Sequence, residues 1–486
     1  MALKPTVGII GGIDSSGAAG IAMDIQAAAS IGVHTAPIVT ALTAQTLTKV
    51  HHVDCTEPAS ILSQLDALGS LESLRAFKIG MLGTGGAVKT VSQYLRSSTG
   101  PVILDPVLFA SAGRSLLDDD GIKALKRELL PVVTILTPNI PEAEILTGRT
   151  ICSRGDMRRA AHQLREMGAK SVVIKGGHGS GRTADDFVAD DQGEFWLSSV
   201  RLPTAVRGTG CAFSSVVAAA LASSHELRDA LVMAKGYLSR GIARSSSVSD
   251  SGPQVLFHDH WPIGHEDFPV VTVGSKPEDP RHDFAAIESD SIGFYPIVPR
   301  ASWVRPLAEL GVKTIQLRIK DLSGDLLECE IADAITAAKS SGTQLFINDY
   351  WELALKYGAF GVHLGQEDLA SADVTRLRLS GIRLGISTHS YFEAAVAHGI
   401  RPSYIALGPI FPTTCKSMRF GPQGFERVKE WRRMLPYPLV AIGGLSPEHR
   451  QRLKECGAEG FAVISDWLHH ANPMIRVQEW LRPIFS

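Results

Sequence analysis

Eight short apolar runs lie within about 190 residues of the second half of the chain, and their spacing constrains the fold more than any other feature. Most of them are separated by a stretch long enough for one helix. Eight strand–helix units of this size predict a (β/α)8 barrel, an α/β fold whose functional side chains follow the carboxyl ends of the strands. The runs cover residues 293–297, 314–317, 344–347, 361–363, 383–386, 404–407, 439–442 and 460–463.

The first half alternates β-rich apolar runs with amphipathic stretches, and glycine or proline marks many of the junctions. This alternation predicts a mostly parallel sheet with helices on both faces, that is, a three-layer αβα domain. We expect strands at residues 7–10, 35–39, 76–79, 102–104, 133–136 and 171–174, and helices that include 18–31, 58–68 and 156–167.

At 486 residues, the chain exceeds the size at which a single hydrophobic core normally keeps growing. We therefore expect an N-terminal domain over residues 1–262, a linker over 263–291 and a C-terminal barrel over 292–486. Prolines and glycines punctuate the polar linker, which we expect to be structured only in part, at 270–273.

The composition narrows the choice of partners and compartment. The 48 basic and 50 acidic residues leave a net charge of −2, so no basic field indicates a nucleic acid or an anionic membrane. The six cysteines lack metal-site spacing, which favours reduced thiols in a cytoplasmic protein. No apolar run has membrane length, and residues 1–12 resemble a buried strand rather than a signal peptide.

The sequence Gly208-Thr209-Gly210-Cys211 stands before an apolar, alanine-rich helical run. A glycine turn that opens a helix presents free backbone N–H groups, which can stabilise negative charge on a phosphoryl group during transfer. Cys211, at the start of the helix, would then face the acceptor hydroxyl. The alternative is that the turn only caps the helix.

Three further polar residues follow predicted strands of the first half. Glu142, with Asn139 beside it, can hold hydrated Mg²⁺ together with phosphate oxygens of ATP. Lys175 can place an ammonium group near the same phosphates. Each residue could also serve only as turn chemistry, but together at strand ends they favour a phosphoryl-transfer site.

These motifs closely resemble the hydroxymethylpyrimidine/phosphomethylpyrimidine kinase branch of the ribokinase-like fold. The resemblance rests on GGID (11–14), TALTAQ (40–45), KIGML (78–82), DPV (105–107), TPNIPE (137–142), KGGH (175–178) and GTGC (208–211). It implies that the pyrimidine pocket is lined by Gly12, Asp24, Gln45, Met81 and Val107.

The resemblance also places Cys211 at the position of the catalytic base. We expect the helix N-terminus to lower the pKa of its thiol, although Cys211 could instead serve core packing. Gln45 can satisfy both a ring nitrogen and an exocyclic amine through its amide. Two positions depart from the family: Ala18 adds a methyl group where the family has glycine, and Arg207 replaces a histidine. An additional cation at 207 is compatible with ATP binding.

Polar side chains follow the predicted barrel strands as well. Arg318 and Lys320 are two residues apart at one strand end, so we expect both to lean to the same face and to suit a pyrophosphate. Asp349 and Asp368 are candidate Mg²⁺ ligands, although a helix N-cap is the commoner use of such an aspartate. The late-strand pairs Gly443-Gly444 and Ile464-Ser465 match the phosphate site often found at that place in barrels.

These residues closely resemble thiamine-phosphate synthase, through QLRIK (316–320), FIND (346–349), GVHLGQEDL (361–369), GISTH (385–389), GPIFPTTCK (408–416) and AIGG (441–444). That family joins hydroxymethylpyrimidine pyrophosphate to a thiazole phosphate and expels pyrophosphate. The resemblance implies that the pyrimidine pyrophosphate is bound by Gln316, Arg318, Lys320, Asn348, Ser387 and Lys416, and the thiazole phosphate by Thr413, Cys415, Gly444, Ile464 and Ser465.

The family normally has a threonine at the position that Cys415 occupies in this sequence. A thiol forms weaker hydrogen bonds than a hydroxyl, so thiazole binding would be reduced unless Thr414 compensates. His363 and His389 are expected to pack or hydrogen-bond rather than to bind metal.

Together the two resemblances indicate a bifunctional enzyme of thiamine biosynthesis that uses ATP, Mg²⁺ and small-molecule substrates. Both families often form oligomers, so self-association is expected. One alternative is a kinase that acts mainly on pyridoxal-type or salvaged pyrimidine alcohols. A second is that one half is a regulatory ligand-binding module without catalysis.

Overall fold

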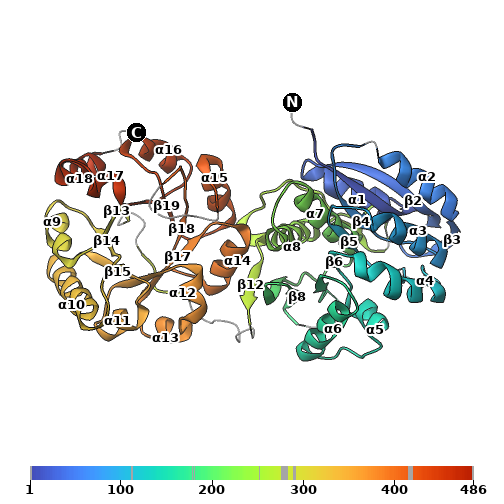
Figure 1. Ribbon diagram of the computed structural model, residues 1–486, viewed down its shortest axis with the longest axis horizontal. Coiled ribbons are helices and arrows are strands. Elements are labelled where there is room, and N and C mark those ends of the chain that lie inside the picture. The colour runs from blue at the N-terminus through green and yellow to red at the C-terminus, as the bar shows by residue number, and fades with distance from the viewer. Residues whose placement is uncertain are drawn as a thin grey trace. The chain divides into compact units, whose positions relative to one another are not determined.

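The computed structural model describes residues 3–69, 71–110, 113–177, 179, 181–250, 252–274, 283–287, 292–413 and 420–483. The chain forms two compact units, Met1–Lys276 and Pro277–Ser486 (Figure 1). Each unit has its own sheet and its own helices, which confirms an α/β fold in both halves.

Ten strands form one sheet in the described part of the first unit, in the order β12-β9-β8-β7-β6-β5-β4-β1-β2-β3. The six strands from β7 to β2 are parallel to their neighbours, and the outer strands pair antiparallel. The strands are β1 Thr6–Asp14, β2 His34–Gln45, β3 Val50–Cys55, β4 Leu74–Ile79, β5 Val102–Leu104, β6 Ile135–Leu136, β7 Ser171–Ile174, β8 Thr183–Asp190, β9 Gly193–Val200 and β12 Val270–Val273. All six predicted strands exist; β3, β8 and β9 were not predicted.

Helices cover both faces of this sheet, which confirms the three-layer αβα arrangement (Figure 1). One face packs against α2 Pro58–Leu68, α3 Gly85–Leu95, α4 Asp119–Ala124, α5 Ile140–Thr147 and α6 Arg154–Glu166. On the other face lie α1 Gly20–Ser30, α7 Thr209–Ala222 and α8 Leu227–Ala243. Successive side chains of β1 point to opposite faces of the sheet. Ile10 therefore packs in the hydrophobic cluster with α2 to α6, while the equally buried Ile9 lies outside that cluster.

The segment expected to be a linker is partly a strand of the first sheet. β12 pairs antiparallel with β9, and Val271 lies opposite Leu197 with 2% of its surface exposed. An apolar strand at a sheet edge gains both ladder hydrogen bonds and burial, which explains why it docks there. The division between the compact units thus falls after Lys276, whereas the sequence placed the domain end at 262.

The second unit is a closed barrel of eight strands, as predicted. They are β13 Gly293–Val298, β14 Thr314–Leu317, β15 Gln344–Asn348, β16 Gly361–Leu364, β17 Arg383–Thr388, β18 Tyr404–Leu407, β19 Leu439–Ile442 and β20 Gly460–Val463. Tyr295, Phe346 and Tyr404 form a buried aromatic cluster in the barrel core, with ring centroids 5.2–6.0 Å apart. The helices are α9 Val304–Glu309, α10 Gly324–Ser341, α11 Trp351–Lys356, α12 Gln366–Ser371, α13 Val374–Leu379, α14 Tyr391–Ile400, α15 Gly424–Met434, α16 Arg450–Glu455, α17 Ser465–Leu468 and α18 Pro473–Leu481.

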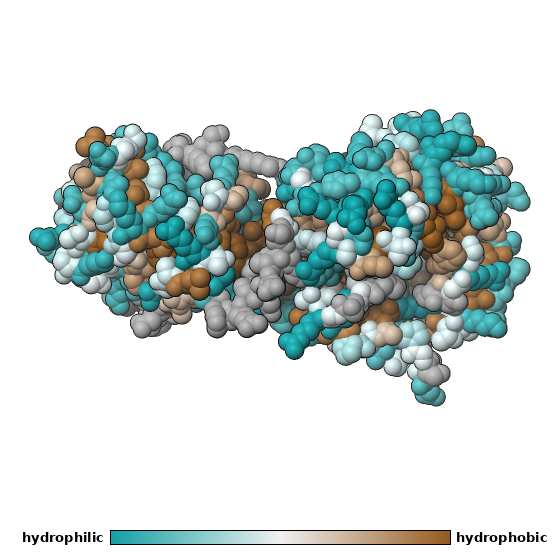
Figure 2. Space-filling model, turned by 90° about the horizontal axis from the view of Figure 1, so that it is seen from below, coloured by the Kyte–Doolittle hydropathy of each residue, from teal (hydrophilic) through white to brown (hydrophobic). Residues whose placement is uncertain are grey.

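None of the helices in the part of the chain that the structure describes is both long and apolar enough to span a bilayer. On the face that Figure 2 shows, hydrophilic residues are interspersed with smaller hydrophobic areas.

Candidate functional site

A cavity of about 1000 Å³ opens in the first unit where the parallel strands end. Parallel strands bring their carboxyl ends to one edge of the sheet, and ligands bind there in open α/β folds. All the predicted site residues of the first half line this cavity: Gly12, Asp24, Gln45, Met81, Val107, Asn139, Glu142, Lys175, Gly208, Gly210 and Cys211.

The glycine turn at the start of α7 depends on both of its glycines, the N-cap Gly208 and Gly210 in the first helical turn. Gly208 is the N-cap and has a φ of 79°, and a Cβ there would lie 2.4 Å from the carbonyl oxygen of Ala18. A Cβ on Gly210 would lie 3.2 Å from Lys175 Nζ and 3.3 Å from Asp105 Oδ2. The absence of side chains therefore brings the first amides of the helix, which have no helical acceptor, close to an ammonium group.

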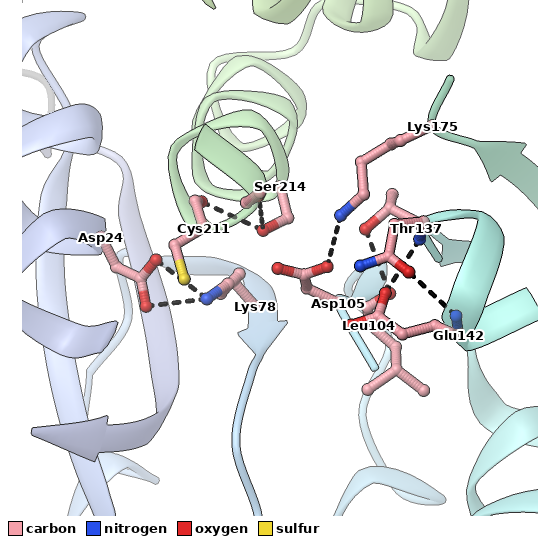
Figure 3. Close-up of polar contacts among 11 residues, drawn as sticks. Asp24, Lys78, Leu104, Asp105, Thr137, Glu142, Lys175, Cys211 and Ser214 are labelled. Carbon is pink, nitrogen blue, oxygen red and sulfur yellow. Dashed lines mark hydrogen bonds and ion pairs between the residues drawn. The ribbon is translucent and has the colours of Figure 1, made fainter. Parts of the chain in front are cut away.

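Lys175 and Asp105 form an ion pair at the centre of this edge. Lys175 follows β7, and its Nζ donates to Asp105 Oδ1 at 2.7 Å (Figure 3). Asp105 directly follows β5 and is 3% exposed. The turn after Lys175 is fixed by Asp186, which accepts from the backbone N–H of Gly176 at 2.9 Å.

Asn139 and Glu142 form a reciprocal capping box at the start of α5. The Asn139 N–H donates to Glu142 Oε2 at 2.8 Å, and the Glu142 N–H donates to Asn139 Oδ1 at 2.9 Å. Burial raises the pKa of Glu142 to about 7, while the ammonium of Lys175 opposes the rise. Glu142 is thus a capping residue and also a carboxyl group that a cation at this edge would ionise.

Beneath the glycine turn lies a second, deeper ion pair. Lys78 Nζ donates to both oxygens of Asp24 at 2.8 Å (Figure 3). Ser215 Oγ also donates to Asp24 Oδ1 at 2.8 Å. The side chains of Lys78 and Asp24 are each 1% exposed. Asp24 therefore lines the expected pocket, but its oxygens are already bonded within the protein.

The pKa of the Cys211 thiol differs from the sequence-based expectation. The sequence predicted that the helix N-terminus lowers the pKa of its thiol, but withdrawal of the sulfur from water raises that pKa to about 11, although the Lys78 ammonium opposes the rise. The carboxylates of Asp24 and Asp105 add to it. The sequence predicts the helix start and therefore its dipole, but it does not predict how far the sulfur of Cys211 is removed from water.

We therefore expect Cys211 to react slowly with thiol reagents. At pH 8, alkylation by iodoacetamide should be at least about 100-fold slower than at the exposed Cys152 and Cys329, because the thiolate is the reactive species. Mass spectrometry of peptides over a time course gives the three rates. Equal rates at the three positions would contradict the raised pKa.

In the barrel, Lys320, Asp349 and Asp368 are brought together from the segments that follow three successive strands, and Asp368 lies in the first turn of α12. Lys320 Nζ donates to Asp349 Oδ2 at 2.6 Å. Burial and the facing carboxylate of Asp349 raise the pKa of Asp368. β14 ends at Leu317, so Arg318 and Lys320 lie in the loop after the strand, the first half-buried and the second exposed.

A buried hydrogen-bonded chain crosses the barrel core between two residues expected to bind the pyrimidine pyrophosphate. Gln316 Nε2 donates to the Tyr295 hydroxyl at 3.4 Å, and that hydroxyl lies 2.9 Å from the hydroxyl of Tyr404. His363 joins the Tyr404 hydroxyl at 2.7 Å to Ser387 Oγ at 2.9 Å. His363 hydrogen-bonds as expected, and burial lowers its pKa to about 4.

Removing the central hydroxyl should destabilise the barrel. Tyr404→Phe leaves the Tyr295 hydroxyl and His363 Nδ1 without this partner, so we expect a loss of about 1–3 kcal/mol in the free energy of unfolding. Urea unfolding followed by barrel tryptophan fluorescence measures it. Tyr350→Phe is the control, because that half-buried hydroxyl makes one weak bond of 3.4 Å; an equal loss there would contradict the argument.

The last strands form a tight backbone corner. Gly443 and Gly444 have φ values of 96° and 66°, and a Cβ on Gly444 would lie 2.7 Å from the carbonyl oxygen of Pro412. Thr413 follows directly, and Ile464 and Ser465 come directly after β20, at the start of α17. The other residues expected here, Cys415 and Lys416, lie outside the described residues. His389, expected to pack or hydrogen-bond, contacts Glu393 through Nδ1 at 2.8 Å.

Comparison with known proteins matches each unit to a family. The profile of the phosphomethylpyrimidine kinase family matches residues 14–254, and that of the thiamine monophosphate synthase family matches residues 295–467. A rice (Oryza sativa subsp. japonica) protein named "Probable thiamine biosynthetic bifunctional enzyme, chloroplastic" is 31% identical over 480 residues, which are 95% of this chain and 85% of the relative. The chain belongs to the bifunctional enzymes of thiamine biosynthesis. It combines phosphomethylpyrimidine kinase and thiamine-phosphate synthase activities.

Relatives of the separate domains agree with this family. The thiamine-phosphate synthase of Rhizobium etli is 47% identical over 189 residues, which are 39% of this chain and 93% of the relative. The pyridoxal kinase of Staphylococcus aureus, solved with pyridoxal, is 26% identical with a TM-score of 0.52 and is covered completely by 56% of this chain. The same kinase with AMP-PCP is 25% identical with a TM-score of 0.51, over 56% of this chain and 99% of that kinase. These likenesses confirm the ribokinase-like fold of the kinase domain.

Several charged residues that line the cavity of the bifunctional enzyme's kinase domain were not predicted as site residues, and three of them contact the predicted residues Asp24, Lys175 and Gln45. Asp105 and Lys78 line the cavity through the ion pairs described above. A lysine inside a predicted buried strand and an aspartate directly after another were the available signals. Arg207, noted only as a cation compatible with ATP binding, lines the cavity too and bonds to Gln45.

Proposed function

We propose that the kinase domain phosphorylates hydroxymethylpyrimidine and then its monophosphate with ATP, and that the barrel joins the resulting pyrophosphate to a thiazole phosphate. The observation that carries the first step is the convergence of the glycine turn and Lys175 on one side of the cavity, with Gln45 and Met81 also in its lining. The product of the first site would be the substrate of the second, which gives the fusion a chemical reason.

In the kinase site, Lys175 and the first amides of α7 would stabilise the phosphoryl group during transfer. ATP as the donor is supported by the Staphylococcus aureus kinase, which was solved with the nucleotide analogue AMP-PCP. Asn139 and Glu142 would lie on the nucleotide side. Cys211 would contact the acceptor hydroxyl as a neutral thiol, because its pKa of about 11 leaves little thiolate at pH 7.

In the synthase site, the bond between the pyrimidine methylene carbon and the pyrophosphate oxygen would break, and the thiazole nitrogen would form the new bond to that carbon. The departing pyrophosphate would be held by Arg318, Lys320, Asn348 and Lys416. Gln316 and Ser387 would place the pyrimidine and its leaving group. Thr413, Cys415, Gly444, Ile464 and Ser465 would hold the thiazole phosphate.

The donor set of the barrel fits Mg²⁺. Burial raises the pKa of Asp368, the facing carboxylate of Asp349 adds to the rise, and a divalent cation would relieve the repulsion between the two carboxylates. Two carboxylates, water and pyrophosphate oxygens are the ligands that Mg²⁺ prefers. When bound, the ion would supply positive charge to the leaving group. In the kinase domain, Glu142 offers one carboxylate for a separate Mg²⁺ ion.

The test is a coupled assay on the purified chain with hydroxymethylpyrimidine, MgATP and thiazole phosphate. We expect the pyrimidine monophosphate to appear first, then the pyrimidine pyrophosphate, and finally thiamine monophosphate. Pyridoxal is the competing substrate, because the similar Staphylococcus aureus structure is a pyridoxal kinase that binds it. A kcat/KM for pyridoxal above that for both pyrimidines would overturn the kinase proposal, and pyrimidine pyrophosphate without thiamine monophosphate would overturn that for the barrel.

Three wider expectations belong to the same proposal. We propose a cytoplasmic enzyme with small-molecule substrates, without a nucleic acid or membrane partner, that forms a homo-oligomer. The rice relative carries "chloroplastic" in its name, so a location in a plastid is the alternative to test. Cell fractionation and light scattering of the purified chain measure location and oligomeric state.

A further inference from the structure

We propose that Arg207 is a specificity-determining residue of the kinase domain, which fixes the side-chain amide of Gln45 so that its N–H2 group faces the substrate. The inference rests on the proposed function, because it concerns how that site recognises an aminopyrimidine. Arg207 ends the short strand β10 Val206–Arg207 and directly precedes Gly208. Gly208 begins the glycine turn at 208–210, which is called the phosphate turn from here on because of its proposed role.

The guanidinium of Arg207 reaches across the cavity lining to the hairpin that joins β2 and β3. Its Nη1 donates to the carbonyl oxygen of Leu47 at 2.8 Å, and its Nη2 donates to Gln45 Oε1 at 3.0 Å. Arg207, Gln45 and Leu47 all line the same cavity. The backbone of Gln45 is held separately, because its N–H donates to Ser15 Oγ at 2.9 Å and its carbonyl accepts from that hydroxyl at 3.0 Å.

These contacts fix the direction of the amide without ambiguity. The oxygen and nitrogen of a glutamine are normally hard to tell apart, and either could face a partner that both donates and accepts. A guanidinium has only donors, so the atom that faces Arg207 must be the oxygen. Gln45 Nε2 has no bond to any described residue, and it is left to donate to a ligand.

The burial of Arg207 indicates that this contact serves recognition rather than stability. The residue is 7% exposed, and its Nε is buried without a hydrogen-bond partner in the described part of the chain. No carboxylate among the described residues lies within 4.0 Å of its guanidinium. A buried cation without an anionic partner is unfavourable for folding, so a purely structural position would be better filled by an apolar side chain.

The ligand class follows from this polarity. A donor at Gln45 selects a ring atom that accepts, such as the unprotonated ring nitrogen beside the exocyclic amine of a 4-aminopyrimidine. In the matching 4-oxopyrimidine that ring nitrogen carries a hydrogen and would oppose the amide N–H. A site that donates a hydrogen bond strongly rejects a ligand that also donates at that point. The Gln45 N–H and the ring N–H of the oxo compound would both lose their hydrogen bonds to water without gaining a partner.

The experiment compares kcat/KM of the wild type for the two 5-hydroxymethylpyrimidines, amino and oxo, with that of Arg207→Met. We expect the wild type to prefer the amino compound by roughly 100-fold and the variant to lose about tenfold of that ratio, because the freed amide can turn. The loss should appear in KM, with kcat for the amino compound within about threefold. Arg158→Met, a 63% exposed arginine on α6, is the control and should keep the ratio.

A second variant keeps the test decisive if Arg207→Met folds poorly. Gln45→Glu replaces the donor by an acceptor beside Arg207, so it should reverse the preference toward the oxo compound. An unchanged ratio in Arg207→Met, or an unreversed preference in Gln45→Glu, overturns the inference while leaving the kinase proposal intact. A wild type that phosphorylates neither pyrimidine overturns the proposed function, and this inference with it.

Discussion

Replacing Lys175 by methionine is expected to slow formation of the pyrimidine pyrophosphate by about 100- to 1000-fold. Its Nζ lies 3.2 Å from the position that a Cβ on Gly210 would take, so it is the ammonium group next to the phosphate turn. Charge that develops on the phosphoryl oxygens would lose this partner. The substitution also leaves the 3% exposed Asp105 without its cation, which adds repulsion where negative charge accumulates.

Supplying pyrimidine pyrophosphate should restore thiamine monophosphate formation in Lys175→Met, because the barrel is untouched. The matched control is Lys235→Met, which breaks another buried ion pair of the same cavity, with Asp186 at 2.8 Å. Among the described residues, Lys175 is one of the nearest neighbours of a Cβ on Gly210 and Lys235 is not, so the kinase rate should fall less than about tenfold in Lys235→Met. Equal losses in both variants would show that the effect is structural.

The barrel was the easiest part of the fold to predict, for a physical reason. Parallel strands are buried on both faces, so they appear in the sequence as short apolar runs. All eight barrel strands begin at the predicted residue. β8 was missed because its start is polar, TADD; the second aspartate, Asp186, is 3% exposed and is neutralised by Lys235, 49 residues away. No local pattern reveals such a partner.

The same distinction applies to the site. Residues at strand ends could be predicted to converge, because the topology of a parallel sheet brings those ends together. How they pair could not be predicted, since Lys78 and Asp24 are 54 residues apart and Arg207 and Gln45 are 162 apart. Ionisation was also beyond the sequence: the helix start at Cys211 predicted a lowered pKa, but the surroundings of the sulfur raise it.

The second large effect is expected at Asp349. Asp349→Asn should lower thiamine monophosphate formation from pyrimidine pyrophosphate and thiazole phosphate by at least about 100-fold, because a carboxylate ligand of Mg²⁺ is lost. Asp349 has a φ of 68°, a left-handed conformation that asparagine adopts as readily as aspartate, so the backbone should be preserved. The measured loss would then report the charge rather than a local rearrangement.

The dependence on Mg²⁺ separates two ways in which the carboxylate could act. If Asp349 binds the ion, a higher Mg²⁺ concentration should restore part of the rate in Asp349→Asn, and the apparent affinity for Mg²⁺ should fall. If it only orients Lys320, at 2.6 Å, the rate should stay low at every concentration, which would contradict the metal assignment. Asp321→Asn is the control: this 64% exposed side chain pairs with Arg300 on the surface, where an ion pair contributes little, so both the rate and the Mg²⁺ dependence should match the wild type.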